Sequence, residues 1–304
     1  TPVFLRIMSG YVHRSPRRID RMVGVFYYPP YASPSCHSPN PLLRFRNPDI
    51  EVTSLTQTPS ISADLYVTCI IDQLYPEVGI SAVKVLRRLG VKVGFPEDQT
   101  CCGQPVYNTG FNSQARTLAK RVLEQFRKSE YVVVPSGSCA ATIRVFYLEL
   151  FADDPDLLAQ AQVLASKTYE FSEFLVNVLN VEDASVCGAT HQGSATYHPS
   201  CHLLRELGVK TEPMKLLNSV PGLEKKELDG AEICCGFGGT FSVKFPHISE
   251  GMVADKITNV RASGADTLVA CDMSCLMNMG GALNRQGSDI KIRHLAQILD
   301  ADTD

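Results

Sequence analysis

The chain has 304 residues, 44% of them hydrophobic and 20% charged, which is enough length for two domains and enough apolar content for a buried core. No apolar run approaches the ~20 residues that a membrane-spanning helix needs, so we expect no membrane span. The net charge is −3, and the residues after position 62 are mildly acidic, which argues against a nucleic-acid-binding protein.

Residues 1–62 differ in composition from the rest of the chain. They contain nine Pro, seven Arg and no Lys, and they show neither a strand nor a helix period. Such a segment buries too little apolar surface to offset the entropy of ordering it. We expect a disordered or non-native N-terminal extension, with an organellar transit peptide as the alternative. Cys36 lies in this extension and is expected to have no role.

Strand and helix patterns begin near Asp64 and then alternate. In the first half we expect strands at residues 65–68, 91–95 and 131–134, and helices at residues 77–89 and 111–128. Residues 155–180 read as helices. In the second half we expect strands at residues 195–198, 223–228 and 267–270, and helices at residues 203–207 and 248–262. This alternation predicts an α/β fold of two pseudo-symmetric βαβ-type repeats with largely parallel sheets, divided into domains 63–187 and 188–304.

Cysteine spacing shows the repeat most clearly. In the first half, Cys69 is followed after 31 residues by Cys101-Cys102-Gly103, and Cys139 comes later. In the second half, Cys201 is followed after 32 residues by Cys234-Cys235-Gly236, and Cys275 comes later. Equivalent cysteines are 132, 133, 133 and 136 positions apart, so two diverged copies of one unit explain the pattern.

The predicted positions of these cysteines favour a metal or redox site in each repeat. In the first repeat they follow predicted strands, and the carboxyl ends of parallel strands meet at one edge of a sheet. Cys139 and Cys275 each precede an apolar helix, whose N-terminal dipole favours thiolate. Four thiolates in one pocket repel one another unless a cation neutralises them. A [4Fe–4S] cluster in each repeat fulfils that requirement with four cysteines.

Several other interpretations remain open from the residues alone. A four-cysteine zinc site usually contains two close cysteine pairs, which this spacing lacks, and a vicinal disulfide is strained and rare. His198 and His202 flank Cys201, where they could relay a proton or tune a cluster, and a core or capping role is equally consistent with them. Cys187 lies in the connecting region and reads as unliganded. No Ser–His–Asp set, Walker loop or nicotinamide fingerprint indicates self-contained catalysis.

Five runs in the sequence are distinctive: residues 95–105 (FPEDQTCCGQP), 135–140 (PSGSCA), 197–207 (YHPSCHLLREL), 234–245 (CCGFGGTFSVKF) and 274–281 (SCLMNMGG). Together they resemble the lactate-utilisation protein A family, a compact two-repeat branch of the cysteine-rich, Cys-Cys-Gly superfamily. The resemblance covers about residues 63–299. It implies a cytoplasmic iron–sulphur subunit, peripheral to the membrane at most through partners, of a complex that oxidises L-lactate to pyruvate. The implied partners are two further subunits of the lactate-utilisation complex, a ferredoxin-like iron–sulphur protein and a small protein.

The chain departs from the fuller superfamily motif at one place in each repeat. That motif ends in Cys-x-x-Cys, whereas Ser136 stands three residues before Cys139 and Asp272 stands three residues before Cys275. Cys271 lies one place too early, which leaves its role as a fifth ligand open. Four ligands per repeat favour an ordinary cubane cluster. Larger relatives of the superfamily keep two further readings open, a subunit for glycolate oxidation and a heterodisulfide-reductase-like electron carrier, and a zinc-stabilised non-redox scaffold is the remaining alternative.

Overall fold

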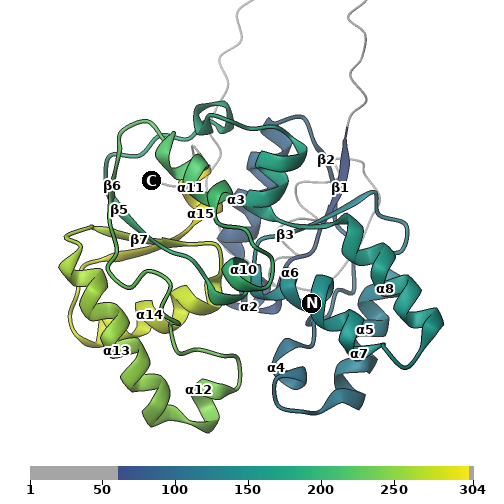
Figure 1. The fold of residues 1–304 in the computed structure, drawn as a ribbon. Helices are drawn as coiled ribbons and strands as arrows, with labels where there is room; N and C mark the ends of the chain where they lie inside the picture. The colour runs from purple at the N-terminus through teal and green to yellow at the C-terminus, as the bar shows by residue number, and fades with distance from the viewer. Residues whose placement is uncertain (1–60, 301–304) are drawn as a thin grey trace, which may run out of the picture.

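The computed structural model describes residues 61–300, so the predicted extension at residues 1–62 lies almost wholly outside it. Two four-stranded parallel sheets form the framework (Figure 1). The first sheet has the order β2-β1-β3-β4 and contains β1 (Ser62–Leu65), β2 (Lys92–Gly94), β3 (Tyr131–Val134) and β4 (Thr168–Glu170). The second has the order β6-β5-β7-β8 and contains β5 (Gly193–His198), β6 (Leu223–Lys226), β7 (Thr267–Ala270) and β8 (Lys291–His294). The predicted α/β fold of two repeats is confirmed.

Helices connect the strands in the same order in both repeats. The first repeat contains α2 (Cys69–Leu74), α3 (Pro76–Arg88), α4 (Gln104–Tyr107), α5 (Asn112–Gln125), α6 (Gly137–Ala141), η1 (Thr142–Phe146), α7 (Tyr147–Leu150), α8 (Pro155–Lys167), α9 (Phe171–Glu173) and η2 (Phe174–Val178). The 3₁₀ turn η3 (Ala184–Cys187) leads to the second repeat. That repeat contains α10 (Cys201–Arg205), α11 (Thr211–Asn218), α12 (Phe241–Lys244), α13 (Pro246–Ala262), α14 (Met273–Arg285) and α15 (Leu295–Leu299).

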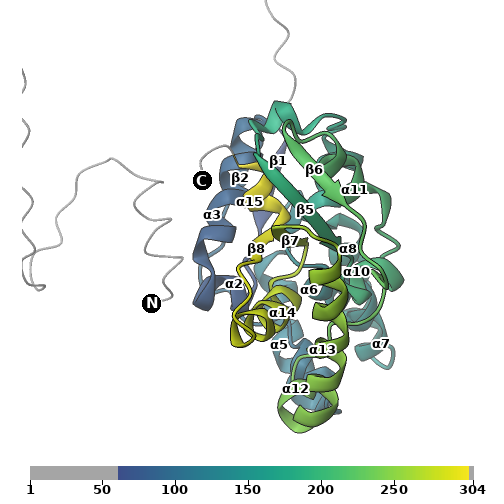
Figure 2. The same ribbon diagram turned by 90° about the vertical axis from the view of Figure 1, so that its left-hand side faces the viewer.

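Contacts between the two repeats are reciprocal. The last helix of the second repeat, α15, packs on α3 of the first, and both views show this yellow helix against the blue one (Figures 1 and 2). In the same way α9 of the first repeat packs on α11, which is the counterpart of α3. The pairs α6–α10 and α2–α14 are likewise equivalent. The repeats are therefore related by an approximate two-fold axis, and each contributes its last helix to the other.

One large apolar cluster joins both repeats, and a second, smaller one lies within the first repeat. Leu65 and Val133 from the first sheet belong to the same buried cluster as Leu268 from the second sheet and Leu299 from α15. Parallel strands covered on both faces are typically continuous apolar runs, and β3 and β7 fit this rule. Among residues 61–300, no helix combines the length and the apolar character needed to cross a membrane.

Close packing of α6 on α10 depends on Gly137. A Cβ atom built at this position would lie 2.5 Å from the Cβ of Leu203 and 2.9 Å from Oγ of Ser200. We therefore expect Gly137→Ala to lower the free energy of unfolding by about 1–3 kcal/mol, because the interface has no room for a methyl group. Anaerobic urea unfolding measures this change. Gly251→Ala in α13 is the matched control, since no atom lies within 4 Å of its Cβ and alanine should stabilise that helix by about 0.5–1 kcal/mol.

Candidate metal centres

Four cysteines of the first repeat come together at the carboxyl edge of the first sheet. Cys69 is the first residue of α2, and Cys139 lies in the first turn of α6. The Sγ atoms of Cys69 and Cys101 are 3.8 Å apart, and those of Cys102 and Cys139 are 3.4 Å apart. A hydrogen bond between the Cys101 and Cys102 side chains links the two pairs into one tetrad. Residues separated by up to 70 positions thus meet as the sequence predicts.

Electrostatics within the first tetrad make Cys101 its thiolate. Hydrogen bonds from the thiols of Cys102 and Cys69 lower the pKa of Cys101 to about 3, and the backbone N–H of Gly103 also donates to its Sγ, at 3.4 Å. The pKa of Cys69 is raised well above its ordinary value, first by its hydrogen bond to Cys101 and then by burial. Repulsion from the first thiolate therefore disfavours deprotonation of a second thiol in the tetrad. A bound cation would offset this repulsion.

The second repeat builds the same arrangement. Side-chain hydrogen bonds link Cys201 to Cys234, Cys234 to Cys235, and Cys235 to Cys275. Bonds from Cys201 and Cys235 lower the pKa of Cys234 to about 2, and the backbone N–H of Gly236 donates to its Sγ at 3.4 Å. Cys275 lies in the first turn of α14, as Cys139 does in α6. The two tetrads are equivalent in their elements and in the backbone N–H group that donates to the first cysteine of each Cys-Cys pair.

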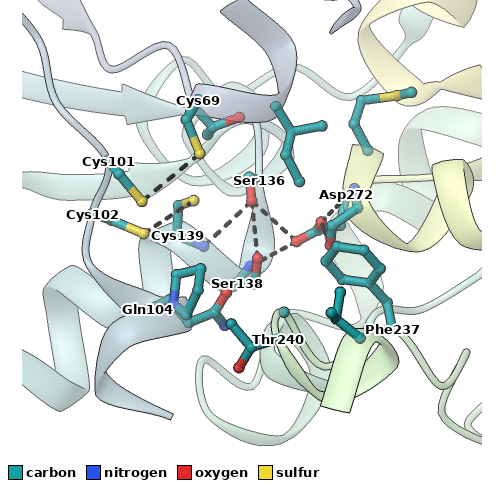
Figure 3. Close-up of a pocket in the computed structure, with 17 residues that line it drawn as sticks. Cys69, Cys101, Cys102, Gln104, Ser136, Ser138, Cys139, Phe237, Thr240 and Asp272 are labelled. Carbon is teal, nitrogen blue, oxygen red and sulfur yellow. Dashed lines mark hydrogen bonds between the residues drawn. The ribbon is translucent and has the colours of Figure 1, made fainter. Parts of the chain in front are cut away.

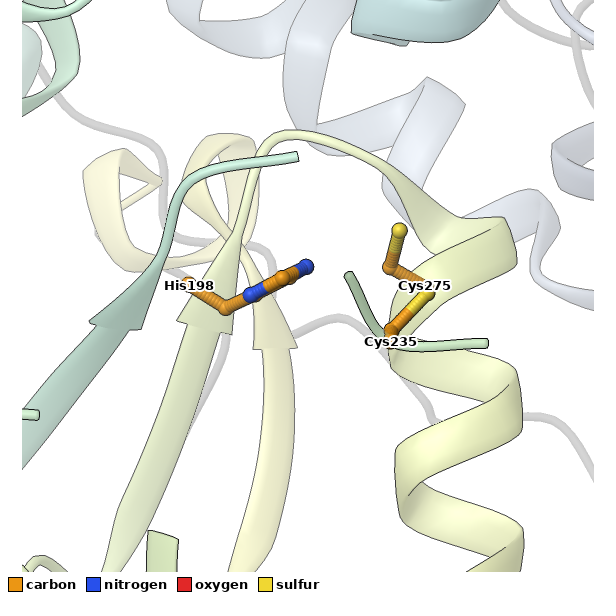
Figure 4. Close-up of side chains that lie close together, drawn as sticks. All are labelled: His198, Cys235 and Cys275. Atoms are coloured by element: carbon orange, nitrogen blue, oxygen red, sulfur yellow. The ribbon is translucent and has the colours of Figure 1, made fainter. Parts of the chain in front are cut away.

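His198 distinguishes the second tetrad. It lies at the end of β5, and its ring points toward Cys235 and Cys275, with one ligand atom from each of the three residues lying within 4.8 Å of the others (Figure 4). Burial, and next the charge of Lys256, lower its pKa to about 3, so its imidazole is neutral at physiological pH. A neutral, buried imidazole has one N–H donor and one lone pair, so it can donate and accept a hydrogen bond, and its lone pair can ligate a metal.

A cavity of about 210 Å³ lies between the repeats beside the first tetrad. Figure 3 shows the four thiols on one side and Phe237, Thr240 and Asp272 of the second repeat on the other. The cavity supplies space for inorganic atoms next to the sulphurs. Four convergent thiols beside such a space are the donor set that an iron–sulphur cluster uses. The residues present therefore fit the predicted cofactor.

The two non-cysteine positions of the motif join the repeats. Ser136 caps α6, Asp272 caps α14, and Oγ of Ser136 donates to Oδ2 of Asp272 at 3.0 Å. The same carboxylate oxygen accepts the N–H of Ser138 at 2.9 Å, while Oδ1 accepts the N–H of Ser274 at 3.1 Å. The N-termini of α6 and α14, which carry Cys139 and Cys275 in their first turns, are thus held by one buried aspartate. Sequence reasoning noted these two residues only as missing cysteines, although their positions before helices signal N-caps.

Cys271 forms its side-chain hydrogen bonds outside the two tetrads. Its Sγ accepts the hydroxyl of Tyr197 at 3.5 Å, it hydrogen-bonds with Ser172, and the carboxyl group of Glu170 acts on it electrostatically. Burial and next Glu170 raise the pKa of its thiol well above the ordinary value. These surroundings are typical of a structural cysteine. Cys187 is also buried, and its pKa is raised by burial to about 11.

His202 contacts its neighbour in the second tetrad. Its Nδ1 lies 3.7 Å from Sγ of Cys201, and its ring meets the edge of Phe146 from the first repeat at 5.8 Å between centroids. His202 is half-buried, in contrast to His198. It therefore bridges the repeats through an aromatic contact while touching a tetrad sulphur.

Glu170 is a buried acid at the repeat interface. It caps α9, where its Oε2 accepts the N–H of Ser172 at 2.8 Å, and burial raises its pKa to about 8. The folded state therefore holds the proton more tightly than the unfolded state, in which the pKa is about 4.5. Its contribution to stability is complete below pH 4.5 and is lost as the pH rises toward 8.

This acid predicts a pH-dependent stability. Between pH 6 and pH 8 we expect the wild-type protein to lose about 2 kcal/mol of stability from Glu170, at about 1.4 kcal/mol per pH unit below the folded pKa. Glu170→Gln mimics the protonated acid and should flatten this dependence. Anaerobic unfolding at both pH values tests it, and equal pH slopes for the two proteins would contradict the assignment.

Comparison with known proteins matches the repeat. The family described as "Cysteine-rich domain" (CCG) matches residues 63–144 and 195–280, one match in each repeat. "Lactate utilization protein A" of Bacillus subtilis (strain 168) is 50% identical over 241 residues, which cover 79% of this chain and 100% of that protein. The chain belongs to the lactate utilization protein A family.

Other members of the lactate utilization protein A family match to the same extent. The proteins of Shouchella clausii (strain KSM-K16) and Geobacillus kaustophilus (strain HTA426) are each 50% identical over 241 residues, covering 79% of this chain and 99% of each relative. Among solved structures, glutamate racemase RacE1 from Bacillus anthracis aligns with a TM-score of 0.32 at 11% identity, covering 78% of this chain and 77% of that chain. That score is too low to indicate a common fold.

Proposed function

We propose that this chain is the iron–sulphur subunit of a multi-protein complex that oxidises L-lactate to pyruvate. The observation that carries the proposal is the pair of equivalent cysteine tetrads in a chain of this family. L-lactate releases two electrons and two protons as it becomes pyruvate. A [4Fe–4S] cluster in each tetrad would accept and release these electrons one at a time.

In this proposal each tetrad binds one cluster. Cys69, Cys101, Cys102 and Cys139 would bind one cluster, and Cys201, Cys234, Cys235 and Cys275 the other. The N–H groups of Gly103 and Gly236 each donate to a ligand sulphur, which lowers the electron density on that sulphur. Burial of Cys102, Cys139, Cys235 and Cys275 limits the access of water to each centre. We further propose residues 63–187 and 188–304 as the two structural units.

Partner proteins complete the proposed reaction. A ferredoxin-like iron–sulphur protein and a small third protein of the complex would carry the electrons onward and contribute the lactate site, and the complex would work in the cytoplasm. The substrate could instead be glycolate or a disulfide. In either case the same two tetrads would bind the clusters. A zinc-stabilised scaffold is the alternative from a different class, and His198 near two cysteines gives it a possible nitrogen ligand.

Two measurements test the proposal. Anaerobically purified protein should contain iron and acid-labile sulphide and give an EPR signal on reduction, whereas colourless protein with stoichiometric zinc would overturn it. A strain lacking the gene should fail to grow on L-lactate and grow normally on glucose and on glycolate. Failure on glycolate with normal growth on L-lactate would transfer the function to the other 2-hydroxy acid.

A further inference from the structure

Lys256 places a buried positive charge beside the second tetrad. It lies on α13, is 1% exposed, and its Nζ donates to the carbonyl oxygens of Gly230 and Ala231 at 2.7 Å each. These carbonyls belong to the loop that leads into Cys234. The tetrad side chains that interact electrostatically with its ammonium are Cys235, Cys275 and Cys234, in that order of strength. The amine thus lies within electrostatic range of three of the four ligands of one centre, held there by the loop that leads into Cys234.

The first repeat has an apolar side chain at the equivalent position. Gly103 packs on Ala115 and Leu118 of α5, and Gly236 packs in the same way on Ser249 and Met252 of α13, which sets an offset of 134 between these helices. Lys256 therefore corresponds to Val122, which is 0% exposed.

A second position near the tetrads also differs between the repeats. His198 occupies the position that Tyr66 holds in the first repeat, three residues before the first tetrad cysteine. The Tyr66 hydroxyl donates to the carbonyl of Thr100 at 2.6 Å, and burial raises the pKa of this phenol far above its ordinary value. The first tetrad thus has a neutral phenol and a valine where the second has an imidazole and an ammonium group.

We propose that the charge of Lys256 raises the reduction potential of the centre in the second tetrad above that of the centre in the first. The inference rests on the proposed function, because it requires a redox cluster in each tetrad. Reduction adds one negative charge to a cluster. A buried cation stabilises that charge more strongly than a cation at the same distance in water would. In an electron transfer between the two centres, the first is oxidised and the second is reduced by one electron. Burial lowers the pKa of Lys256 to about 8, so the amine is still mostly protonated at pH 7.

A redox titration followed by EPR tests this proposal on the full chain. Lys256→Met removes the charge and keeps an unbranched side chain that is one heavy atom shorter. It should lower the potential of the second centre so that its reduction constant falls about tenfold, equal to 59 mV for a one-electron couple. The first centre should keep its potential. Loss of one signal in Cys234→Ser identifies which potential belongs to the second centre.

Two further variants separate the charge from a structural role. Lys256→Arg keeps the charge and should restore most of the potential. Lys167→Met is the matched control, since Nζ of Lys167 donates to the carbonyls of Phe126, Arg127 and Ser129, but the charge acting on it is Asp64 rather than a cysteine. It should lower stability and leave both potentials unchanged.

Failure of this inference can be distinguished from failure of the proposed function. Iron-loaded protein whose second potential is the same in the wild type and in Lys256→Met, or whose first centre has the higher potential, would overturn the role of Lys256 alone. Wild-type protein without iron or sulphide would overturn the proposed function and this inference together.

Discussion

Replacing Cys102 with serine should remove about half of the bound iron and leave the other half in place. Cys102 is buried and hydrogen-bonds with both Cys101 and Cys139, so it is central to the first tetrad. Two [4Fe–4S] clusters hold about eight iron atoms, and loss of one leaves about four. Cys235→Ser should remove the other half, and the double variant should contain almost none. Iron and sulphide analysis of anaerobically purified protein measures each result.

Cys187→Ser serves as the control for this experiment. Cys187 is as buried as Cys102 but belongs to the connection between the repeats, where its backbone carbonyl accepts a hydrogen bond from Arg88. Its loss should leave the iron content unchanged. If Cys102→Ser retained all of its iron, or if Cys187→Ser lost as much, the tetrads would not be the binding sites.

Asp272→Ala should destabilise the protein by about 3 kcal/mol, the second largest effect that we expect. Asp272 is 1% exposed and accepts hydrogen bonds from Ser136, Ser138 and Ser274. Bonds to a charged group contribute about 1.5–3 kcal/mol each, and an N-cap about 1 kcal/mol, while relaxation of the cavity recovers part of this. Alanine would leave the donors of two helix starts without a partner. Anaerobic urea unfolding measures the loss.

Asp183→Ala is the matched control for the capping contribution. Asp183 caps η3 through the N–H of Ser185 at 2.8 Å, but it is exposed. Its removal should cost much less stability than removal of Asp272. A similar cost for the two aspartates would mean that the contact between Asp272 and Ser136 adds nothing to the joining of the repeats.

Much of this architecture could be predicted because periodicity and spacing encode it directly. The strands at residues 131–134 and 267–270 and the helix of residues 77–89 lie within one residue of β3, β7 and α3. The fourth strands, β4 and β8, escaped prediction because they are short and end in buried polar residues, Glu170 and His294, that cap the following helix. Short strands with this composition look like loops until the parallel neighbour that pairs with them is known.

The candidate sites, like the fold, could be predicted from the sequence only in part. Cysteine spacing predicted both tetrads, because the same spacing in two repeats indicates the same arrangement of cysteines in each. It did not reveal Lys256, which is one lysine among 29 basic residues until the helices of the two repeats are superimposed. Nor did it show that the cavity beside Cys102 is lined on its other side by Phe237 and Thr240 of the second repeat. Contacts between repeats depend on the two-fold arrangement, which no local pattern specifies.

The exchange of last helices, α15 onto α3 and α9 onto α11, has an evolutionary consequence. A gene for one such repeat would encode a chain whose terminal helix belongs on a second copy, so the ancestral protein would be a domain-swapped homodimer. Polypeptides 63–187 and 188–304 produced separately should accordingly associate into a heterodimer, and neither should be stable alone. Once the two halves were encoded in one polypeptide, their sequences could diverge. The position of Val122 in the first half could then become Lys256 in the second.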